Sequence, residues 1–341
     1  MKPLERLKAK FEGQLTDRPL FCPAIYEHKA ALIDKSPSHI AQDTDLLTEA
    51  VLAEYETYKP DMLTVGVDIY NIEAEAIGCK VLYPEAIDAV PVVVDRVLHT
   101  AADIDRLPHI DAEQTARMPL MLKAAENVHK KLGDHVLVRG AVSGPFSMAA
   151  ELMGIEPLLI AMMMKPELFQ KLLDYCTAIV IDYGKAFIKR GLSVCIFDSQ
   201  ATPPLLSPNL YQTFILPGIV RINAAFKQSG CVYTEYVIGG KTDAIAVFML
   251  ASECDIILSD YPSYPTSFIQ TKSRQQLIRR NISSMLIEKG DTPELRQQIH
   301  YIKTLINTYS NFIIGTGVIS YNTSVEYLCK VMKTVQEVSY D

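Results

Sequence analysis

Eight short segments in which apolar residues follow one another with little polar alternation predict buried β-strands. They cover residues 21–26, 62–69, 135–142, 193–197, 231–238, 255–259, 284–287 and 311–314. Segments with a helical repeat of apolar positions lie between them, at residues 46–58, 116–131, 166–189, 210–229 and 292–309. Strands that alternate with helices along a whole chain indicate a parallel α/β arrangement.

Eight such strands predict a closed (β/α)8 barrel of the TIM type, with an open, doubly wound sheet as the alternative. The chain has 341 residues and shows neither an internal repeat nor a Pro/Gly/Ser-rich linker, so we expect one domain over residues 1–341. A minimal barrel needs only about 250 residues. We expect much of the excess in residues 79–119. The site is then expected at the mouth formed by the C-terminal ends of the strands.

The composition argues against a nucleic-acid-binding, secreted or membrane protein. The 33 Lys and Arg residues against 40 Asp and Glu residues leave a net charge of -7, which argues against a nucleic-acid binder. The start of the chain lacks the apolar core of a secretory signal, and the longest later apolar stretch is about half the ~20 residues of a membrane span. We therefore expect a cytoplasmic protein with no membrane partner.

No familiar cofactor motif is present in the sequence. The seven cysteines form no CxxC pair and the seven histidines no HxxxH pair, so neither a disulfide framework nor a zinc motif is predicted. A glycine-rich nucleotide-binding pattern is also absent. We predict no metal ligands.

Residues 65–78, VGVDIYNIEAEAIG, hold the densest polar cluster that follows a predicted strand. Asp68 ends an apolar run, where a buried carboxylate is costly unless it is paired or used. Asp68 is thus a candidate catalytic group, and Tyr70, Asn71 and Glu73 are candidate substrate-binding groups. The alternative is that Asp68 caps the next helix and that Glu73 lies in its solvated first turn.

Other candidates also follow predicted strands. Glu27 and His28 offer a carboxylate beside a group that titrates near neutrality, although an exposed surface pair is an equal alternative. Asp198 ends a buried run and precedes two prolines, and Asp260 has the same position on a later strand. A further set is predicted to shape the pocket: Ser143, Tyr233 and Glu235. If the substrate is a carboxylic acid, Arg139 is the strand-end arginine that we expect to bind its carboxylate.

Six segments, in the same order along the chain, resemble motifs of one superfamily. They are ERLKAKFEGQLTDRP at 5–19, DIYNIEAEAIGCKV at 68–81, VSGPFSMAAELMG at 142–154, FDSQATPPLLSPNLYQTFILPGI at 197–219, RNISSMLIEKGDTPELRQQI at 280–299 and GTGVISYNTSVEYL at 315–328. Together they resemble the uroporphyrinogen decarboxylase and cobalamin-dependent methyltransferase superfamily over nearly the whole chain. The resemblance implies a (β/α)8 barrel, places Asp68 where that family keeps an essential aspartate, and suggests a homodimer.

The sequence departs from the family at two places that carry chemistry. Thiol-methylating members hold zinc with an HxCG motif and the Cys of a GCG motif, whereas the matching positions here are Val237, Gly239 and Thr316. Zinc is therefore left open, with its usual ligands absent. Decarboxylase members follow their first strand with an arginine-rich segment, whereas residues 26–31 contain no arginine. An acidic pocket would repel a polycarboxylate.

The remaining branch implies a methyltransferase that moves a methyl group from a small donor to the cobalt of a corrinoid. Because the chain has no DxHxxG corrinoid segment, a partner protein is expected to carry that corrinoid. The donor is a methyl ether or a methylamine, and we favour an O-demethylase in which His28 or Glu27 supplies the proton. The alternatives are a lyase acting on a carboxylic acid and a non-catalytic subunit of a corrinoid system.

Overall fold

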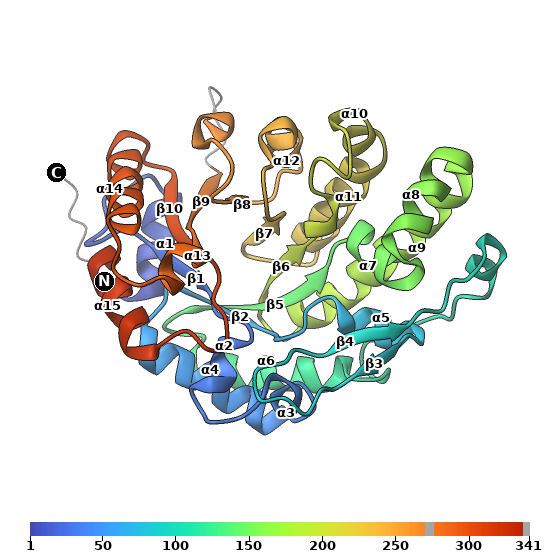
Figure 1. Ribbon diagram of the computed structural model, residues 1–341, viewed down its shortest axis with the longest axis horizontal. Helices are drawn as coiled ribbons and strands as arrows, with labels where there is room; N and C mark the ends of the chain where they lie inside the picture. Colours follow the sequence, from blue (N-terminus) through green and yellow to red (C-terminus); the bar gives the residue numbers. More distant parts are fainter. Residues whose placement is uncertain (270–275, 337–341) are drawn as a thin grey trace.

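The computed structural model describes residues 1–269 and 276–336 of the chain. Eight parallel strands follow one another in the order β1-β10-β9-β8-β7-β6-β5-β2 and form a nearly closed barrel with helices around it (Figure 1). The two end strands of this sheet meet, because the backbone N–H of Asp61 donates a hydrogen bond of 2.9 Å to the carbonyl of Phe21. The predicted (β/α)8 barrel is confirmed, and the doubly wound alternative is wrong because the end strands β1 and β2 of the sheet come together.

The barrel strands are short and buried. Their bounds are β1 Phe21–Ala24, β2 Met62–Val65, β5 Leu137–Ser143, β6 Ser193–Phe197, β7 Thr234–Val237, β8 Ile256–Ser259, β9 Leu277–Ile282 and β10 Phe312–Val318. The other two strands, β3 Lys80–Leu82 and β4 Val92–Asp95, form an antiparallel hairpin outside the barrel. This hairpin occupies part of the predicted excess at residues 79–119.

Helices surround the strands and cover their outer faces. Their bounds are α1 Pro3–Phe11, α2 His28–Ala31, α3 Pro37–Ile40, α4 Thr44–Tyr58, α5 Asn71–Ile77, α6 Met118–Leu132, α7 Pro145–Met153, α8 Ile155–Met164, α9 Pro166–Ile188, α10 Pro208–Leu210, α11 Leu216–Gln228, α12 Ala246–Ala251, α13 Ser284–Glu288, α14 Pro293–Thr308 and α15 Val325–Gln336. No single helix among the described residues is both long and apolar enough to cross a membrane; α7 and α8 meet the criterion only as a pair bent by 109°.

One predicted strand was wrong. Residues 284–287 form helix α13, and the strand of that repeat is β9, Leu277–Ile282. The sequence of β9, LIRRNI, was not predicted to be a buried strand because two arginines interrupt its apolar run. Burial of Arg280 is possible because its guanidinium donates to the carbonyls of Asp260 at 2.7 Å and Ser263 at 2.8 Å.

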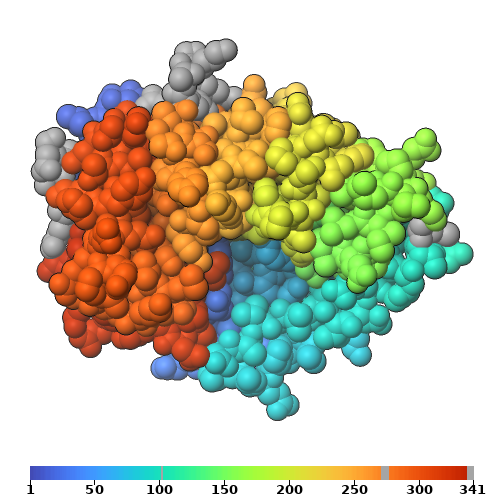
Figure 2. Space-filling view, turned by 45° about the horizontal axis from the view of Figure 1, so that its top comes forward, coloured from blue at the N-terminus to red at the C-terminus, as the bar shows by residue number. Residues whose placement is uncertain are grey.

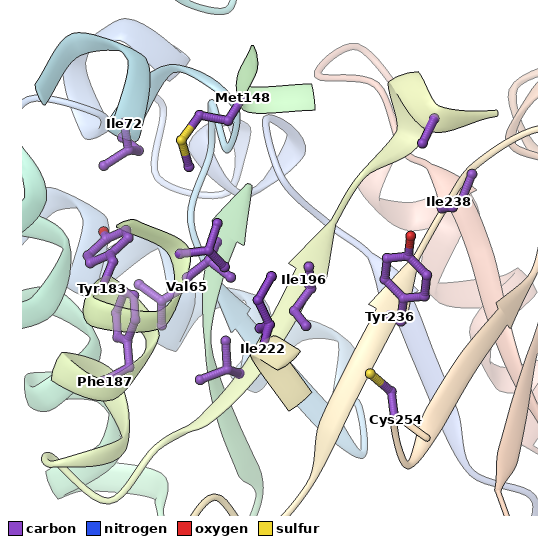
Figure 3. Close-up of a cluster of buried hydrophobic side chains, with 14 of the residues drawn as sticks. Val65, Ile72, Met148, Tyr183, Phe187, Ile196, Ile222, Tyr236, Ile238 and Cys254 are labelled. Atoms are coloured by element: carbon purple, nitrogen blue, oxygen red, sulfur yellow. The ribbon is translucent and has the colours of Figure 1, made fainter. Parts of the chain in front are cut away.

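The core between strands and helices is apolar (Figure 3). Val65 of β2 faces Tyr183 and Phe187 of α9, and Ile196 of β6 lies beside Ile222 of α11. Gly140 of β5 permits the close approach of α9, because a Cβ at this position would lie 2.3 Å from the Phe187 ring. This packing fixes the strands on which the inward-facing side chains are carried.

The interior of the barrel is arranged in layers along its axis. At the N-terminal end, Leu7 of α1 closes the barrel over an apolar layer made by Leu20, Cys22, Met62, Leu137, Ile256, Leu277 and Ile313. A charged layer of Arg139, Glu235 and Arg279 follows. Nearest the C-terminal end lies a second apolar layer of Ile69, Ala141, Cys195, Phe197, Val237 and Leu258. Any ligand must therefore enter from the C-terminal end.

Candidate active site

A pocket of about 260 Å³ opens at the C-terminal ends of the strands. Figure 2 shows the surface hollowed between the orange part of the chain and the cyan hairpin region, with blue residues visible inside the hollow. Apolar side chains make up much of its wall: Ala24, Tyr26, Val67, Ile69, Val90, Phe197, Val237, Leu258 and Val318. The polar side chains on the wall are Asp68, Tyr70, Asn71, Ser199, Asp260, Arg279, Asn281 and Thr316. Small apolar cavities with a few directed polar groups are typical ligand sites.

Asp68 lies on the pocket wall in a fixed orientation. The Arg117 guanidinium donates to both of its carboxylate oxygens, at 3.1 Å from Nη1 to Oδ1 and 2.8 Å from Nη2 to Oδ2. The Asn71 side chain donates to Oδ2 at 3.2 Å and to the carbonyl of Pro91 at 2.7 Å. Burial raises the pKa of Asp68, and the Arg117 charge opposes that rise. Asp68 is therefore a paired, buried group that orients Asn71.

Arg117 was missed in the sequence. It lies 49 residues from Asp68 in the sequence, directly before helix α6, and also forms an ion pair with Glu75. The Tyr83 hydroxyl donates to Glu75 at 2.7 Å, and the Arg117 guanidinium lies over the Tyr83 ring. No local motif marks this arginine, because its partners come from α5 and the hairpin.

Tyr70 and Asp260 face the pocket from different strand ends. The Tyr70 hydroxyl accepts a hydrogen bond of 3.3 Å from the Ser199 N–H, and burial raises the pKa of Tyr70 to about 12. The phenol therefore keeps its proton at neutral pH and can donate it. The Asp260 carboxylate accepts from the N–H of Gly240 at 2.8 Å and from the Asn281 amide at 2.9 Å.

Glu27 and His28 do not line the pocket. His28 is fully buried, with Nδ1 at 2.9 Å from the Ser320 carbonyl and Nε2 at 2.7 Å from the Tyr58 hydroxyl. A carbonyl can only accept, so Nδ1 carries the proton and Nε2 accepts from Tyr58. Burial lowers the pKa of His28 and raises that of Glu27. In this geometry His28 ties α2 to α4 and to the loop after β10.

Three other predicted residues lie behind the pocket wall. The Glu73 carboxylate accepts from Ser143, at 2.7 Å from its N–H and 3.0 Å from its hydroxyl, and burial raises the pKa of Glu73 to about 7. Asp198 accepts from the Ser147 N–H at 2.7 Å at the start of α7, and burial raises its pKa to about 6. Gly144 is essential to this contact, since a Cβ there would lie 2.2 Å from the Asp198 carboxyl carbon.

Tyr233 and Glu235 lie below the pocket. Tyr233 stacks on Phe11 of α1, with ring centroids 4.3 Å apart, at the opposite end of the barrel. Glu235 is fully buried in the charged layer, where it forms ion pairs with Arg139 and with Nε of Arg279 at 2.6 Å. Arg139 also donates to the Thr64 hydroxyl at 2.7 Å. Arg139, which we expected to bind a substrate carboxylate, is therefore bound to Glu235 and Thr64 and does not line the pocket. Arg279 lines the pocket instead.

A profile of the uroporphyrinogen decarboxylase (URO-D) family matches residues 2–338. The chain belongs to the uroporphyrinogen decarboxylase family. The pocket lies at the C-terminal ends of the barrel strands, where the sequence pattern predicted it.

Several relatives are methyltransferases. A methylcobamide:CoM methyltransferase from Methanosarcina barkeri is 24% identical over 258 residues, which cover 70% of each chain. A methylated-thiol–coenzyme M methyltransferase from Methanosarcina mazei is 23% identical over 301 residues, 86% of this chain and 77% of the relative. A uroporphyrinogen decarboxylase from Mycobacterium tuberculosis is 27% identical over 205 residues, 58% of this chain and 54% of the relative.

A solved structure shares the fold over the full length. A methyltransferase from Methanosarcina mazei aligns with a TM-score of 0.83 and 19% sequence identity, covering 100% of both chains. The arrangement of strands and helices is therefore that of a known member of this fold.

The residues present do not fit the zinc site that the resemblance implies. Val237, Gly239 and Thr316 line the pocket at the three ligand positions, and the Thr316 hydroxyl accepts from the Ala24 N–H at 3.0 Å. Within residues 1–269 and 276–336, no group of three His, Cys, Asp or Glu side chains could hold a metal ion. Zinc prefers thiolate, imidazole and carboxylate ligands, which these three positions do not provide.

Proposed function

We propose that the protein transfers a methyl group from a small methyl ether to the cobalt of a corrinoid carried by a partner protein. The observation that carries this proposal is a small, largely apolar pocket at the barrel mouth of a chain whose relatives over 70% or more of its length are methyltransferases. The partner's corrinoid is the methyl acceptor and is a substrate of this chain.

The residues of the chain have two tasks in this reaction. They must hold the methyl carbon toward the mouth, where the acceptor can reach it, and they must stabilise the leaving group. As the C–O bond breaks, its electron pair stays on the ether oxygen, which then takes a proton. We assign that proton to Tyr70, because its phenol is protonated at neutral pH and lies on the wall.

Asp68 is assigned a positioning role. Its two oxygens are held by Arg117, and it fixes the Asn71 side chain beside Tyr70. Apolar neighbours such as Phe197 and Val237 exclude water from the reacting group. His28 and Glu27, the proton donors expected from the sequence, have no part in this mechanism.

The test is a spectroscopic assay that follows the conversion of cobalt(I) cobalamin to methyl-cobalt(III). Phenyl methyl ethers, aliphatic methyl ethers, methylamines, betaines and methylthiols serve as donors. We expect methyl transfer from an ether and a loss of about 100-fold or more in kcat for Tyr70→Phe. Tyr264→Phe removes an exposed hydroxyl near the same face and is the control.

If no donor yields methyl-cobalt(III), either with free cobalamin or with a corrinoid protein, the proposal is overturned. Release of carbon dioxide from an acid without any partner would favour the lyase. Transfer that persists unchanged in Tyr70→Phe would remove the proton-donor assignment but leave the reaction.

A further inference from the structure

We propose that the floor of the pocket is an anion site, in which Arg279 binds a carboxylate at the end of the methyl donor farthest from its methyl group. The identification of this ligand as a methyl donor rests on the proposed function. The anion site itself rests on the contacts and charges of the charged layer.

Arg279 lies deep in the pocket. It is on β9 with its side chain inside the barrel and is 3% exposed. In the register with β10, Arg279 is opposite Ile313 and Asn281 is opposite Gly315, so Arg279 starts about 7 Å farther from the mouth than Asn281. Gly315 leaves space for the side chain, since a Cβ there would approach Arg279 Cγ to 2.9 Å.

The charged layer holds two guanidinium groups and one carboxylate. Arg139 and Arg279 share the single carboxylate of Glu235, whose two oxygens each face one of them. Burial raises the pKa of Cys195 to about 11 and that of Tyr26 still higher, so both neighbours stay neutral at pH 7. Asp260 also acts electrostatically on Arg279, so what a bound anion adds here is hydrogen-bond acceptors for a buried guanidinium.

Asp260 is another carboxylate on the wall near this layer. Its oxygens accept from the Gly240 N–H and the Asn281 amide, and no ion pair joins it to Arg279 among the described residues. Neutral donors therefore hold this carboxylate, and the hydrogen-bonding capacity of Arg279 is left for another partner.

The terminal nitrogens of Arg279 have that capacity. In the part of the chain that the structure describes, they make no hydrogen bond, while Nε faces Glu235. Tyr26, close enough to interact electrostatically with Arg279, likewise has no hydrogen-bond partner within those residues. A guanidinium edge binds a carboxylate through two parallel hydrogen bonds, and a phenol adds a third donor.

The depth of the arginine determines which end of the ligand it holds. A methyl group at the floor would be out of reach of an acceptor at the mouth, so the group at Arg279 is the distal end. The wall between them is formed by Ile69, Phe197, Val237 and Leu258, with Phe197 edge-on to Tyr26 at 5.6 Å. The donor class is therefore an apolar carboxylic acid with its O-methyl group opposite the carboxylate. Simple methylamines lack the anion and would bring a cation toward two guanidinium groups.

The experiment measures binding to the full chain without any corrinoid. Isothermal titration compares 4-methoxybenzoate, benzoate and 3-methoxypropionate with the neutral 4-methoxybenzamide. We expect at least one acid to bind, with the amide clearly weaker, and at least about tenfold weaker acid binding in Arg279→Gln. Arg221→Gln removes an exposed arginine paired with Asp174 and should leave acid binding unchanged.

Arg279→Lys is a second variant, in case Arg279→Gln does not fold. Lysine keeps the positive charge but cannot form two parallel hydrogen bonds to a carboxylate, so we expect its affinity for the acid to lie between those of the parent protein and Arg279→Gln. Cys22→Ser changes the thiol that accepts from Arg139 at 3.2 Å, and we expect acid binding to be retained.

Equal binding of acid and amide, or acid binding that is unchanged in folded Arg279→Gln and Arg279→Lys, would overturn the anion site. Acid binding without methyl transfer would overturn the proposed function alone. Methyl transfer from neutral ethers with kcat/KM equal to that of the acids would overturn the anion site alone.

Discussion

Arg117 forms a bidentate ion pair with Asp68 of the pocket wall, with oxygen–nitrogen distances of 2.8 and 3.1 Å, although 49 residues separate them in the sequence. Both side chains are at least nine-tenths buried. The pair joins the segment after β2 to the start of α6 and thereby fixes the wall that carries Tyr70 and Asn71.

Arg117→Met should lower the free energy of unfolding by about 3–5 kcal/mol, because it leaves the buried Asp68 carboxylate without its partner. Urea denaturation followed by circular dichroism measures the change. Arg296→Met, which removes the exposed pair with Asp291, is the control and should have no measurable effect. Equal losses in the two variants would contradict the importance of the buried pair.

Glu73→Gln should stabilise the protein at pH 7.5 and flatten its dependence on pH. The pKa of Glu73 is raised to about 7 by burial, so the folded chain holds this proton more tightly than the unfolded chain. The contribution of Glu73 to stability is complete below the unfolded pKa near 4.5 and is lost as pH rises through about 7. The isosteric amide needs no proton, and its oxygen still accepts from the Ser143 N–H.

The expected gain at pH 7.5 is about 1–3 kcal/mol. Urea denaturation at several values between pH 4.5 and 8 measures it, with Glu49→Gln on the exposed face of α4 as the control. Asp198 acts in the same direction, with its contribution lost as pH rises through about 6. A Glu73→Gln variant that is less stable than the parent at pH 7.5 would show that the carboxylate is needed in its charged form.

His28→Phe should weaken the fold and leave the chemistry intact. The change removes both hydrogen bonds of the ring, to Ser320 and Tyr58, at a cost of about 1–3 kcal/mol. The double variant His28→Phe/Tyr58→Phe should recover part of that loss, because the Tyr58 hydroxyl is no longer buried without a partner. Thermal unfolding and kcat of the folded variant are the measurements. A tenfold fall in kcat with an intact fold would restore His28 as a catalytic candidate.

Removal of metal by dialysis against EDTA should leave the methyl-transfer activity unchanged, because the three family ligand positions carry Val237, Gly239 and Thr316. The triple variant Val237→His/Gly239→Cys/Thr316→Cys should gain zinc at a 1:1 ratio, as measured by elemental mass spectrometry. Loss of activity on dialysis that zinc restores in the parent protein would point to another metal site.

The sequence by itself determined the barrel and the end at which the pocket opens. Seven of the eight barrel strands overlap the apolar runs, because a strand buried on both faces needs a short continuous apolar segment. Asp68, Tyr70, Asn71 and Asp260 were placed on the pocket wall by one rule, that strand ends meet at the mouth. The eighth strand was missed because the arginines of LIRRNI conceal its period.

Only the tertiary structure decided which polar residues share the pocket. Glu73, Asp198 and His28 also follow strands, but they form hydrogen bonds away from the cavity, with Ser143, Ser147 and Tyr58 respectively. Arg117 reaches Asp68, and Arg279 reaches the wall, from elements that no local pattern connects with Asp68. The direction of a side chain depends on strand register and helix packing, which are non-local properties, whereas the period of apolar residues is a local one.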